Sequence, residues 1–252
     1  MVMLRCIISF RRSFLKSAIR NCRRNASSAS NVPQFMEFHK DWPERDYSDF
    51  LRHMTIIPDF LSREEVSKFL EEIEPYLQRM RYEFDHWDDA IHGFRETERQ
   101  HWYPYNKATI ERIRNLAFKD EALPHVHILD LAEEGVIKPH VDSVRYCGST
   151  IAGVSLLSDS VMRLVRIDEK KYQQNAESDY RKQPDKSAEN STDPGYFVNI
   201  LLPKRSLYIM RKSARYNFTH EILGNKDSFF EGKAVKKYRR ISIVCRNKPE
   251  SQ

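Results

Sequence analysis

Apolar residues recur at helical spacing in two stretches of the first half of the chain. In residues 63–78 they stand three or four positions apart, which predicts a helix with one buried face. Ser62, with Glu65 three residues later, forms a capping-box pattern at its start, and Pro75 could kink it or end it early. A second helix is predicted over about residues 107–118. Residues 32–55 show no such period and predict an irregular lead-in.

From Pro124 the period of the apolar residues changes to two, which is typical of strands. Short apolar runs then follow at residues 150–157, 161–167, 196–202, 207–210 and 240–245, with no helix predicted between them. Strands without intervening helices favour an antiparallel double-sheet barrel or sandwich over a parallel α/β sheet. The predicted fold class is therefore mainly β with flanking helices.

Two other segments carry a different pattern. Residues 168–194 are highly polar and have almost nothing to bury, which predicts a long, mobile hairpin excursion inserted in the domain. Residues 80–103 are dense in aromatic, histidine and acidic residues. Tyr82, Phe84 and His86 alternate with charged residues there, so a short strand is one interpretation. The segment could pack on the domain surface or form a substrate-facing lid.

The N-terminal segment changes the meaning of the overall charge. Residues 1–31 contain seven Lys or Arg and no Asp or Glu, so the rest of the chain carries −1 of the overall +6. An amphipathic, Arg-rich, acid-free N-terminus is typical of a mitochondrial transit peptide, with a nucleic-acid-binding arm as the alternative. We therefore expect a presequence at residues 1–31, one domain at residues 32–252, and a location in the mitochondrial matrix.

Other features of composition narrow the class of protein. There is no run of 18 apolar residues, so no membrane-spanning helix is expected. Cys147 and Cys245 are the cysteines outside the presequence, and their spacing disfavours a zinc ribbon or a disulfide scaffold. Residues 195–252 hold 13 Lys or Arg against 4 Asp or Glu, a local charge of +9. This basic segment could bind an anionic ligand, or it could complement the acidic residues before it.

A histidine and an aspartate stand two residues apart in the stretch IKPHVDS. In an extended segment His140 and Asp142 point to the same side and can reach one metal ion together. His220, which lies 78 residues after Asp142 among the later strands, is the best candidate for a third ligand. Two imidazoles and a carboxylate form the facial triad of non-haem Fe(II) oxygenases, whose open positions suit a 2-oxo acid and O2. The pair His125 and His127 is a weaker alternative.

Such a site needs a cation for the distal carboxylate of 2-oxoglutarate. Arg240 opens the stretch RISIVCR, 20 residues after His220, and its planar fork can bind a carboxylate in bidentate geometry. Strand alternation places Ser242, Val244 and Arg246 on the same face, while Ile241, Ile243 and Cys245 face the core. Tyr208 could donate a hydrogen bond to the same carboxylate from an adjoining strand.

An HxD pair, a distal His and an R-x5-R stretch, in this order, resemble the AlkB family of Fe(II)/2-oxoglutarate dioxygenases. The resemblance covers residues 56–249 and rests on the segments RYEFDHWDDAIHGFRETE, IKPHVDS, STIAGVSLLS, SLYIMRKSARYNFTHEIL and RRISIVCR. It implies a double-stranded β-helix (jelly roll) that uses Fe(II), 2-oxoglutarate and O2. The implied catalytic metal ligands are His140, Asp142 and His220, and the implied cosubstrate residues are Tyr208, Arg240 and Arg246.

Two features depart from that family. Its nucleic-acid-repairing members have Asn and Tyr 11 and 9 residues before the first His, where this chain has Leu129 and Leu131. Glu221 follows the distal His in place of the frequent Gly. These departures weaken the expectation of the usual cosubstrate contacts and of a nucleotide substrate.

The resemblance implies that 2-oxoglutarate is decarboxylated to succinate while a substrate C–H bond is hydroxylated, which on an N-methyl group ends in demethylation. The near-neutral charge of residues 32–252 favours a protein substrate, and the basic residues 195–252 leave mitochondrial RNA as an alternative. A regulatory protein that retains the iron site is a third interpretation. The resemblance also implies roles in regulated (programmed) necrosis and in fatty-acid metabolism.

Overall fold

The computed structural model describes residues 33–84, 90–119, 121–167 and 195–249. The predicted presequence at residues 1–31 and the predicted polar excursion at residues 168–194 lie outside the described residues. Among the helices within the described ranges, none is both long and apolar enough to cross a bilayer.

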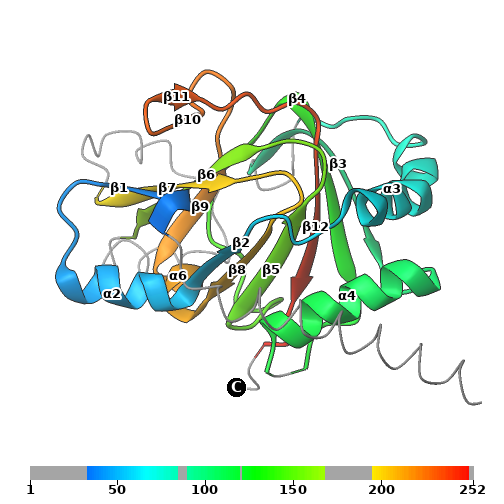
Figure 1. The fold of residues 1–252 in the computed structure, drawn as a ribbon, viewed down its shortest axis with the longest axis horizontal. Helices are drawn as coiled ribbons and strands as arrows, with labels where there is room; N and C mark the ends of the chain where they lie inside the picture. Colours follow the sequence, from blue (N-terminus) through cyan, green and yellow to red (C-terminus); the bar gives the residue numbers. More distant parts are fainter. Residues whose placement is uncertain (1–32, 85–89, 120, 168–194, 250–252) are drawn as a thin grey trace, which may run out of the picture.

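One antiparallel sheet of ten strands makes up most of the fold and curls around a common interior (Figure 1). Its order is β1-β7-β6-β9-β4-β12-β5-β8-β2, and β3 pairs with β4 beside this path. The strands are β1 (Met36–His39), β2 (Met54–Ile57), β3 (Ile91–Arg99), β4 (Val126–His140), β5 (Thr150–Ser155), β6 (Ser160–Arg166), β7 (Phe197–Leu202), β8 (Leu207–Arg211), β9 (Phe218–Ile222) and β12 (Arg240–Arg246). A separate hairpin joins β10 (Phe229–Phe230) to β11 (Lys233–Ala234). The predicted jelly-roll fold class is confirmed.

Strand β4 links the two halves of the curled sheet. It pairs with β12 over residues 127–131 and with β3 over residues 126–137, and its end pairs with β9, where His140 stands opposite His220. The register with β3 shifts between His92 and Phe94, where Gly93 passes Gly135. A Cβ on Gly135 would lie 2.5 Å from the carbonyl oxygen of Gly93, so this close approach requires a residue without a side chain.

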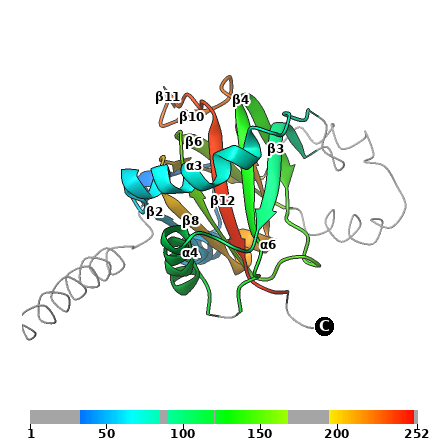
Figure 2. The ribbon, with the colours of Figure 1, turned by 90° about the vertical axis from the view of Figure 1, so that its right-hand side faces the viewer.

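Two apolar cores lie on opposite faces of the sheet. Helices α3 (Arg63–Leu77) and α4 (Pro104–Ala117) cover the outer face (Figure 2), where their apolar sides pack with Ile241 and Ile243 of β12. The other core fills the inside of the roll and contains Leu129, Leu131 and Val244. The predicted alternation along β12 is confirmed, because its successive residues divide between the two faces.

Both predicted helices are present. Helix α3 begins with the predicted capping box, in which Ser62 Oγ accepts a hydrogen bond from the Glu65 amide at 3.1 Å and Glu65 Oε2 accepts one from the Ser62 amide at 2.8 Å. Pro75 lies inside α3 and does not end it early. Helix α4 begins at Pro104, three residues before the prediction, because proline fits the first turn of a helix, where no amide partner is needed.

Two predictions about other elements are wrong, and a third falls partly outside the described residues. Residues 32–55 are not an irregular lead-in, since they contain β1, helix α2 (Glu44–His53) and the start of β2. Helix α2 is held by tertiary packing, such as that of Phe50 on Trp42, which no sequence period announces. The regular strand within residues 80–103 is β3, whereas residue Glu83 makes only an isolated bridge to Phe94, and His86 lies outside the described residues. A five-residue helix, α6 (Lys212–Tyr216), separates β8 from β9, and it is too short to show a helical period.

Candidate metal centre

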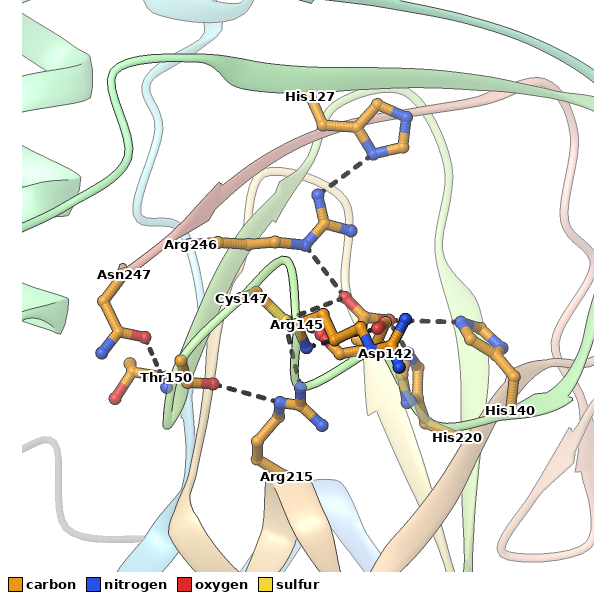
Figure 3. Close-up of polar contacts among 12 residues, drawn as sticks. His127, His140, Asp142, Arg145, Cys147, Thr150, Arg215, His220, Arg246 and Asn247 are labelled. Atoms are coloured by element: carbon orange, nitrogen blue, oxygen red, sulfur yellow. Dashed lines mark hydrogen bonds and ion pairs between the residues drawn. The ribbon is translucent and has the colours of Figure 1, made fainter. Parts of the chain in front are cut away.

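His140, Asp142 and His220 meet where β4 ends (Figure 3). Their ligand atoms lie within 4.8 Å of one another, and no other group of this kind is found among the described residues. His140 Nε2 lies 3.4 Å and His220 Nε2 lies 3.6 Å from Asp142 Oδ1. The sheet explains the meeting, because the two histidines are a cross-strand pair on β4 and β9 and Asp142 follows two residues later.

The protonation states of this group suit a metal. Burial and then the charge of His140 lower the pKa of His220 to about 3, so its imidazole is neutral near pH 7. Burial opposes ionisation of Asp142, but Arg246 and the two histidines still hold the pKa of this carboxyl well below its ordinary value. Metal ions bind neutral imidazole and ionised carboxylate, so the donor set fits a divalent cation that accepts nitrogen and oxygen ligands.

The second ring nitrogen of each histidine has a different environment. His140 Nδ1 lies 2.9 Å from the carbonyl oxygen of Lys138, which places the ring proton on Nδ1 and leaves Nε2 as the nitrogen that would bind a metal. His220 Nδ1 is buried and has no hydrogen-bond partner within the part of the chain that the structure describes. His140 is therefore oriented by its own strand, whereas His220 is oriented by packing.

The outer oxygen of Asp142 is held by an arginine from β12. Arg246 Nε donates to Asp142 Oδ2 at 2.9 Å, and Arg246 Nη1 lies 3.4 Å from His127 Nδ1 (Figure 3). His127 Nε2 in turn lies 2.7 Å from Glu96 Oε2 on β3. This chain of contacts leaves Asp142 Oδ1 facing the two histidines. It also gives Arg246 a structural task beside the metal ligands.

The other histidines and cysteines singled out in the sequence do not join this group. His125 is exposed ahead of β4, and His127 belongs to the contacts with Glu96 and Arg246. The predicted alternative of a His125–His127 metal site is therefore not what the described residues form. Burial raises the pKa of the Cys245 thiol to about 12, and burial and then Asp142 raise that of Cys147, so neither is a nucleophile at neutral pH.

Arg240 and Tyr208 lie inside the roll, as expected for a carboxylate pocket. Arg240 is 2% exposed, its Nε has no hydrogen-bond partner, and no carboxylate pairs with it among the described residues. Burial lowers the pKa of Arg240 but leaves it a cation at neutral pH. A buried cation without a counter-charge is costly, so this position fits the distal carboxylate of an oxo acid. Leu131 stands directly opposite Arg240 on β4 and offers it no polar contact.

The ring of Tyr208 lies across Gly153 of the neighbouring strand. The two residues are a register pair on β8 and β5, and a Cβ on Gly153 would lie 2.5 Å from Tyr208 Cε1 and 2.6 Å from its hydroxyl oxygen. Gly153 therefore sets the position of the Tyr208 ring inside the roll. Sequence reasoning missed this glycine, because its value depends on the side chain opposite it.

Two more residues around the centre were missed. Arg215 of α6 is fully buried and contacts Cys147, and Asn247 binds the amide of Thr150 with its side chain at 2.8 Å. Both hold the loop that follows Asp142. A short stretch of charged residues before His220 was visible in the sequence, but nothing in it showed that Arg215 is buried.

Known proteins resemble the chain in sequence and in fold. No protein-family model matches it. It is 47% identical over 195 residues to "Alpha-ketoglutarate-dependent dioxygenase alkB homolog 7, mitochondrial" of Bos taurus and 48% identical to the protein of that name of Mus musculus, and each match covers 77% of both chains. A prolyl hydroxylase from Trichoplax adhaerens, solved with a peptide fragment of hypoxia inducible factor, has a TM-score of 0.52 at 10% identity and covers 92% of this chain and 96% of its own. That likeness concerns the fold alone.

Proposed function

This chain belongs to the alkB-homologue family of 2-oxoglutarate-dependent dioxygenases, and we propose that it hydroxylates or demethylates a macromolecular substrate in mitochondria, with a protein substrate favoured. It is an oxidoreductase, and its class uses Fe(II), 2-oxoglutarate and O2. The observation that carries the proposal is the meeting of His140, Asp142 and His220 inside the roll, in the protonation states that a metal requires.

We assign His140, Asp142 and His220 as the ligands of Fe(II). When bound, the metal and the oxo acid supply the oxidising chemistry. 2-Oxoglutarate releases CO2 and becomes succinate, which takes up one oxygen atom of O2, and the other oxygen atom is inserted into a substrate C–H bond. Arg246 keeps Asp142 ionised and aimed, since it donates to the outer carboxylate oxygen.

We assign Arg240 and Tyr208 to the distal carboxylate of 2-oxoglutarate. Burial raises the pKa of Tyr208 and the nearby positive charge of Arg240 opposes that rise, so the two side chains lie close together inside the roll. Leu129 and Leu131 line the β4 side and exclude water, which strengthens the attraction between the carboxylate and Arg240. The cosubstrate is thereby held and oriented from β8 and β12.

The distribution of basic residues supports a protein substrate over RNA. Five basic residues of the 195–252 segment pair with carboxylates from earlier in the chain: Arg205–Asp59, Lys236–Glu133, Arg239–Asp130, Arg246–Asp142 and Lys248–Glu121. Arg211, Arg215 and Lys237 donate to backbone carbonyls. Much of the local surplus of positive charge is therefore used within the fold, and does not form the basic footprint expected of a nucleic-acid binder. The peptide bound by the Trichoplax relative is a fold-level analogy for such a substrate.

Both relatives are named as mitochondrial proteins, which supports a mitochondrial location. We propose the matrix, reached by means of residues 1–31, and a reporter fused to residues 1–35 should enter it. A reporter left in the cytosol would contradict the presequence.

The proposed link to regulated necrosis and fatty-acid metabolism predicts that cells carrying Asp142→Ala differ from wild-type cells in both survival of a necrosis-inducing treatment and fatty-acid oxidation.

The catalytic assignment is tested by metal binding and by turnover of 2-oxoglutarate without added substrate. Asp142→Ala and His220→Ala should each abolish Co(II) binding and succinate release, whereas Asp41→Ala, which removes an exposed carboxylate elsewhere, should change neither. Retained Co(II) binding in either ligand variant would reject the assigned site.

The substrate class is tested by mass spectrometry of mitochondrial protein and RNA from cells with wild-type chain or with Asp142→Ala. A protein substrate predicts peptides that carry one more oxygen atom, or one methyl group fewer, only when the wild-type chain is present. A change confined to methylated nucleotides would instead establish the RNA alternative.

A further inference from the structure

Arg215 is the largest side chain in the described part of the protein that is fully buried, with 0% exposed. It lies on α6, five residues before His220, and α6 runs directly into β9. Its guanidinium points at the loop that follows Asp142 (Figure 3). One buried side chain thus lies between the chain segments that carry two of the three assigned metal ligands.

The contacts of Arg215 are directional. Its Nη2 lies 3.1 Å from Cys147 Sγ, its Nε donates to the carbonyl oxygen of Gly148 at 3.3 Å, and its guanidinium packs on the Tyr216 ring at 4.6 Å. Cys147 Sγ in turn lies 3.9 Å from Asp142 Oδ2 and 3.5 Å from the carbonyl oxygen of Ser143. Arg215 therefore reaches the Asp142 carboxylate through a single intervening side chain.

The opposite side of the same loop is closed by the end of β12. Gly148 donates its amide to the carbonyl oxygen of Asn247 at 2.9 Å, and a Cβ on Gly148 would lie 2.2 Å from the carbonyl oxygen of Lys248. The loop therefore cannot move towards β12. On its other side it contacts the Arg215 guanidinium of α6, which limits movement in that direction.

Fold stability alone is a weak reason for this arginine. No carboxylate pairs with Arg215 among the described residues, and its Nη1 is buried without a hydrogen-bond partner. Burying a guanidinium without a carboxylate partner costs folding free energy relative to an apolar side chain of similar size. A contribution to the neighbouring centre would explain its presence.

We propose that Arg215 is a positioning residue of the metal centre, which fixes the Asp142 loop relative to the His220 strand so that the ligand atoms are held ready for the ion. The proposal rests on the proposed function, because it takes His140, Asp142 and His220 as the metal ligands. Arg215 touches neither the metal nor the substrate in this role. It acts through Cys147 and Gly148 on one segment and through its own backbone on the other.

The test is a titration of the full chain with Co(II) alone, followed by the visible absorbance of the bound ion, at a temperature well below the Tm of every variant. Arg215→Met should raise the Kd for Co(II) by about 10- to 100-fold, the usual range for residues that orient metal ligands. Arg215→Lys should lie in between, because lysine keeps the charge but not the fork that contacts Cys147 and Gly148 together.

Arg95→Met is the matched control. Arg95 is also a poorly exposed arginine (11% of its side chain), but it donates to Asp130 and to the carbonyl oxygen of Met80. It should lower the Tm and leave the Kd for Co(II) within about twofold. An Arg215→Met chain that loses Tm like this control and keeps the wild-type Kd would overturn the proposal.

Cys147→Ala removes the intervening thiol at little risk to folding, and it decides the question if Arg215→Met does not fold. It should raise the Kd by a smaller factor, and in the Arg215→Met background it should add less than it does alone, because both changes break one chain of contacts. An unchanged Kd in Cys147→Ala, or full additivity, would reject the proposal. If His220→Ala binds Co(II) normally, the assigned site itself fails. If His220→Ala does not bind Co(II) and Arg215→Met binds it with the wild-type Kd, only the positioning role fails.

Discussion

Replacing Gly153 with alanine tests the cosubstrate pocket without removing any polar group. The new Cβ would lie 2.5–2.6 Å from Cε1, Cζ and the hydroxyl oxygen of Tyr208, whereas ordinary contacts of this kind are about 3.4–4 Å. The ring cannot stay where it is, and with only 8% of the residue exposed it has little room to move. Overpacking of this size costs about 1–3 kcal/mol, so the Tm should fall by roughly 2–12 °C in a chain of this size.

The displaced ring should also weaken cosubstrate binding. A hydrogen bond from Tyr208 to a carboxylate is worth about 1.5–3 kcal/mol, so its loss should raise the KM for 2-oxoglutarate at least ~10-fold. The Kd for Co(II) should not change, because Gly153 lies on β5 and the metal ligands come from β4, β9 and the loop after β4. Succinate release against 2-oxoglutarate concentration and a Co(II) titration measure the two quantities.

Three variants make the reasoning refutable. Gly195→Ala is the control, because a Cβ there would meet its nearest neighbour at an ordinary 3.6 Å. Tyr208→Phe should raise the KM and barely change the Tm, since it removes the hydroxyl and keeps the ring. Gly153→Ala should cost little further stability in a Tyr208→Ala background, where the clash is absent. A Gly153→Ala chain with the wild-type Tm would contradict the predicted clash with Tyr208. A chain with a lowered Tm but the wild-type KM for 2-oxoglutarate would refute the assignment of Tyr208 to the cosubstrate carboxylate.

Three further outcomes are expected. The free energy of unfolding of the metal-free protein should decrease as the pH falls from about 6.5 towards 3, because His220 takes up a proton in the unfolded chain but not in the folded one. In urea unfolding, the difference in this free energy between pH 7.5 and pH 5 should be smaller for His220→Gln than for the wild-type chain. Co(II) at 100 times its Kd should raise the stability of the wild-type chain by about 2.7 kcal/mol in thermal unfolding and leave Asp142→Ala unchanged. Glu72→Ala should lower the free energy of unfolding by about 3–5 kcal/mol in urea, because buried Glu72 accepts hydrogen bonds from Arg99 and Asn106. The Kd for Co(II) should not change, since these contacts lie far from the metal ligands. A changed Kd would show that the two regions are coupled.

The residues with the strongest chemistry could be found in the sequence because each follows a local rule. His140 and Asp142 are two apart, and strand alternation alone puts them on one side. His220 was chosen for its place late in the strand series, and the structure puts it directly opposite His140. Arg240 lies 20 residues after His220, and strand alternation puts it with Arg246 on the face that points away from the helix-covered Ile241 and Ile243.

The sequence could not show which residues from other strands and loops each side chain contacts. Arg246 was expected to line the pocket, but its contact with Asp142 depends on how β12 stands relative to the loop after β4. Arg215 belongs to a helix too short to predict, and burial of its guanidinium follows from packing alone. The α2 segment was missed for a similar reason, because Phe50 of this helix packs on Phe218, a ring distant in the sequence.

The replacement of polar residues by Leu129 and Leu131 acquires a definite meaning from the register. Leu131 stands opposite Arg240 and Leu129 stands opposite Ser242, so β4 offers apolar side chains at the two positions that face the start of β12. The polar side chains assigned to the carboxylate come from two other strands, Arg240 from β12 and Tyr208 from β8. The orientation of Tyr208 is fixed by the absence of a side chain at Gly153. Cosubstrate binding in this chain should therefore depend more on β5 and β8 than on β4, the strand that carries His140. For this reason one methyl group added at Gly153 should weaken the binding of 2-oxoglutarate and leave metal binding unchanged.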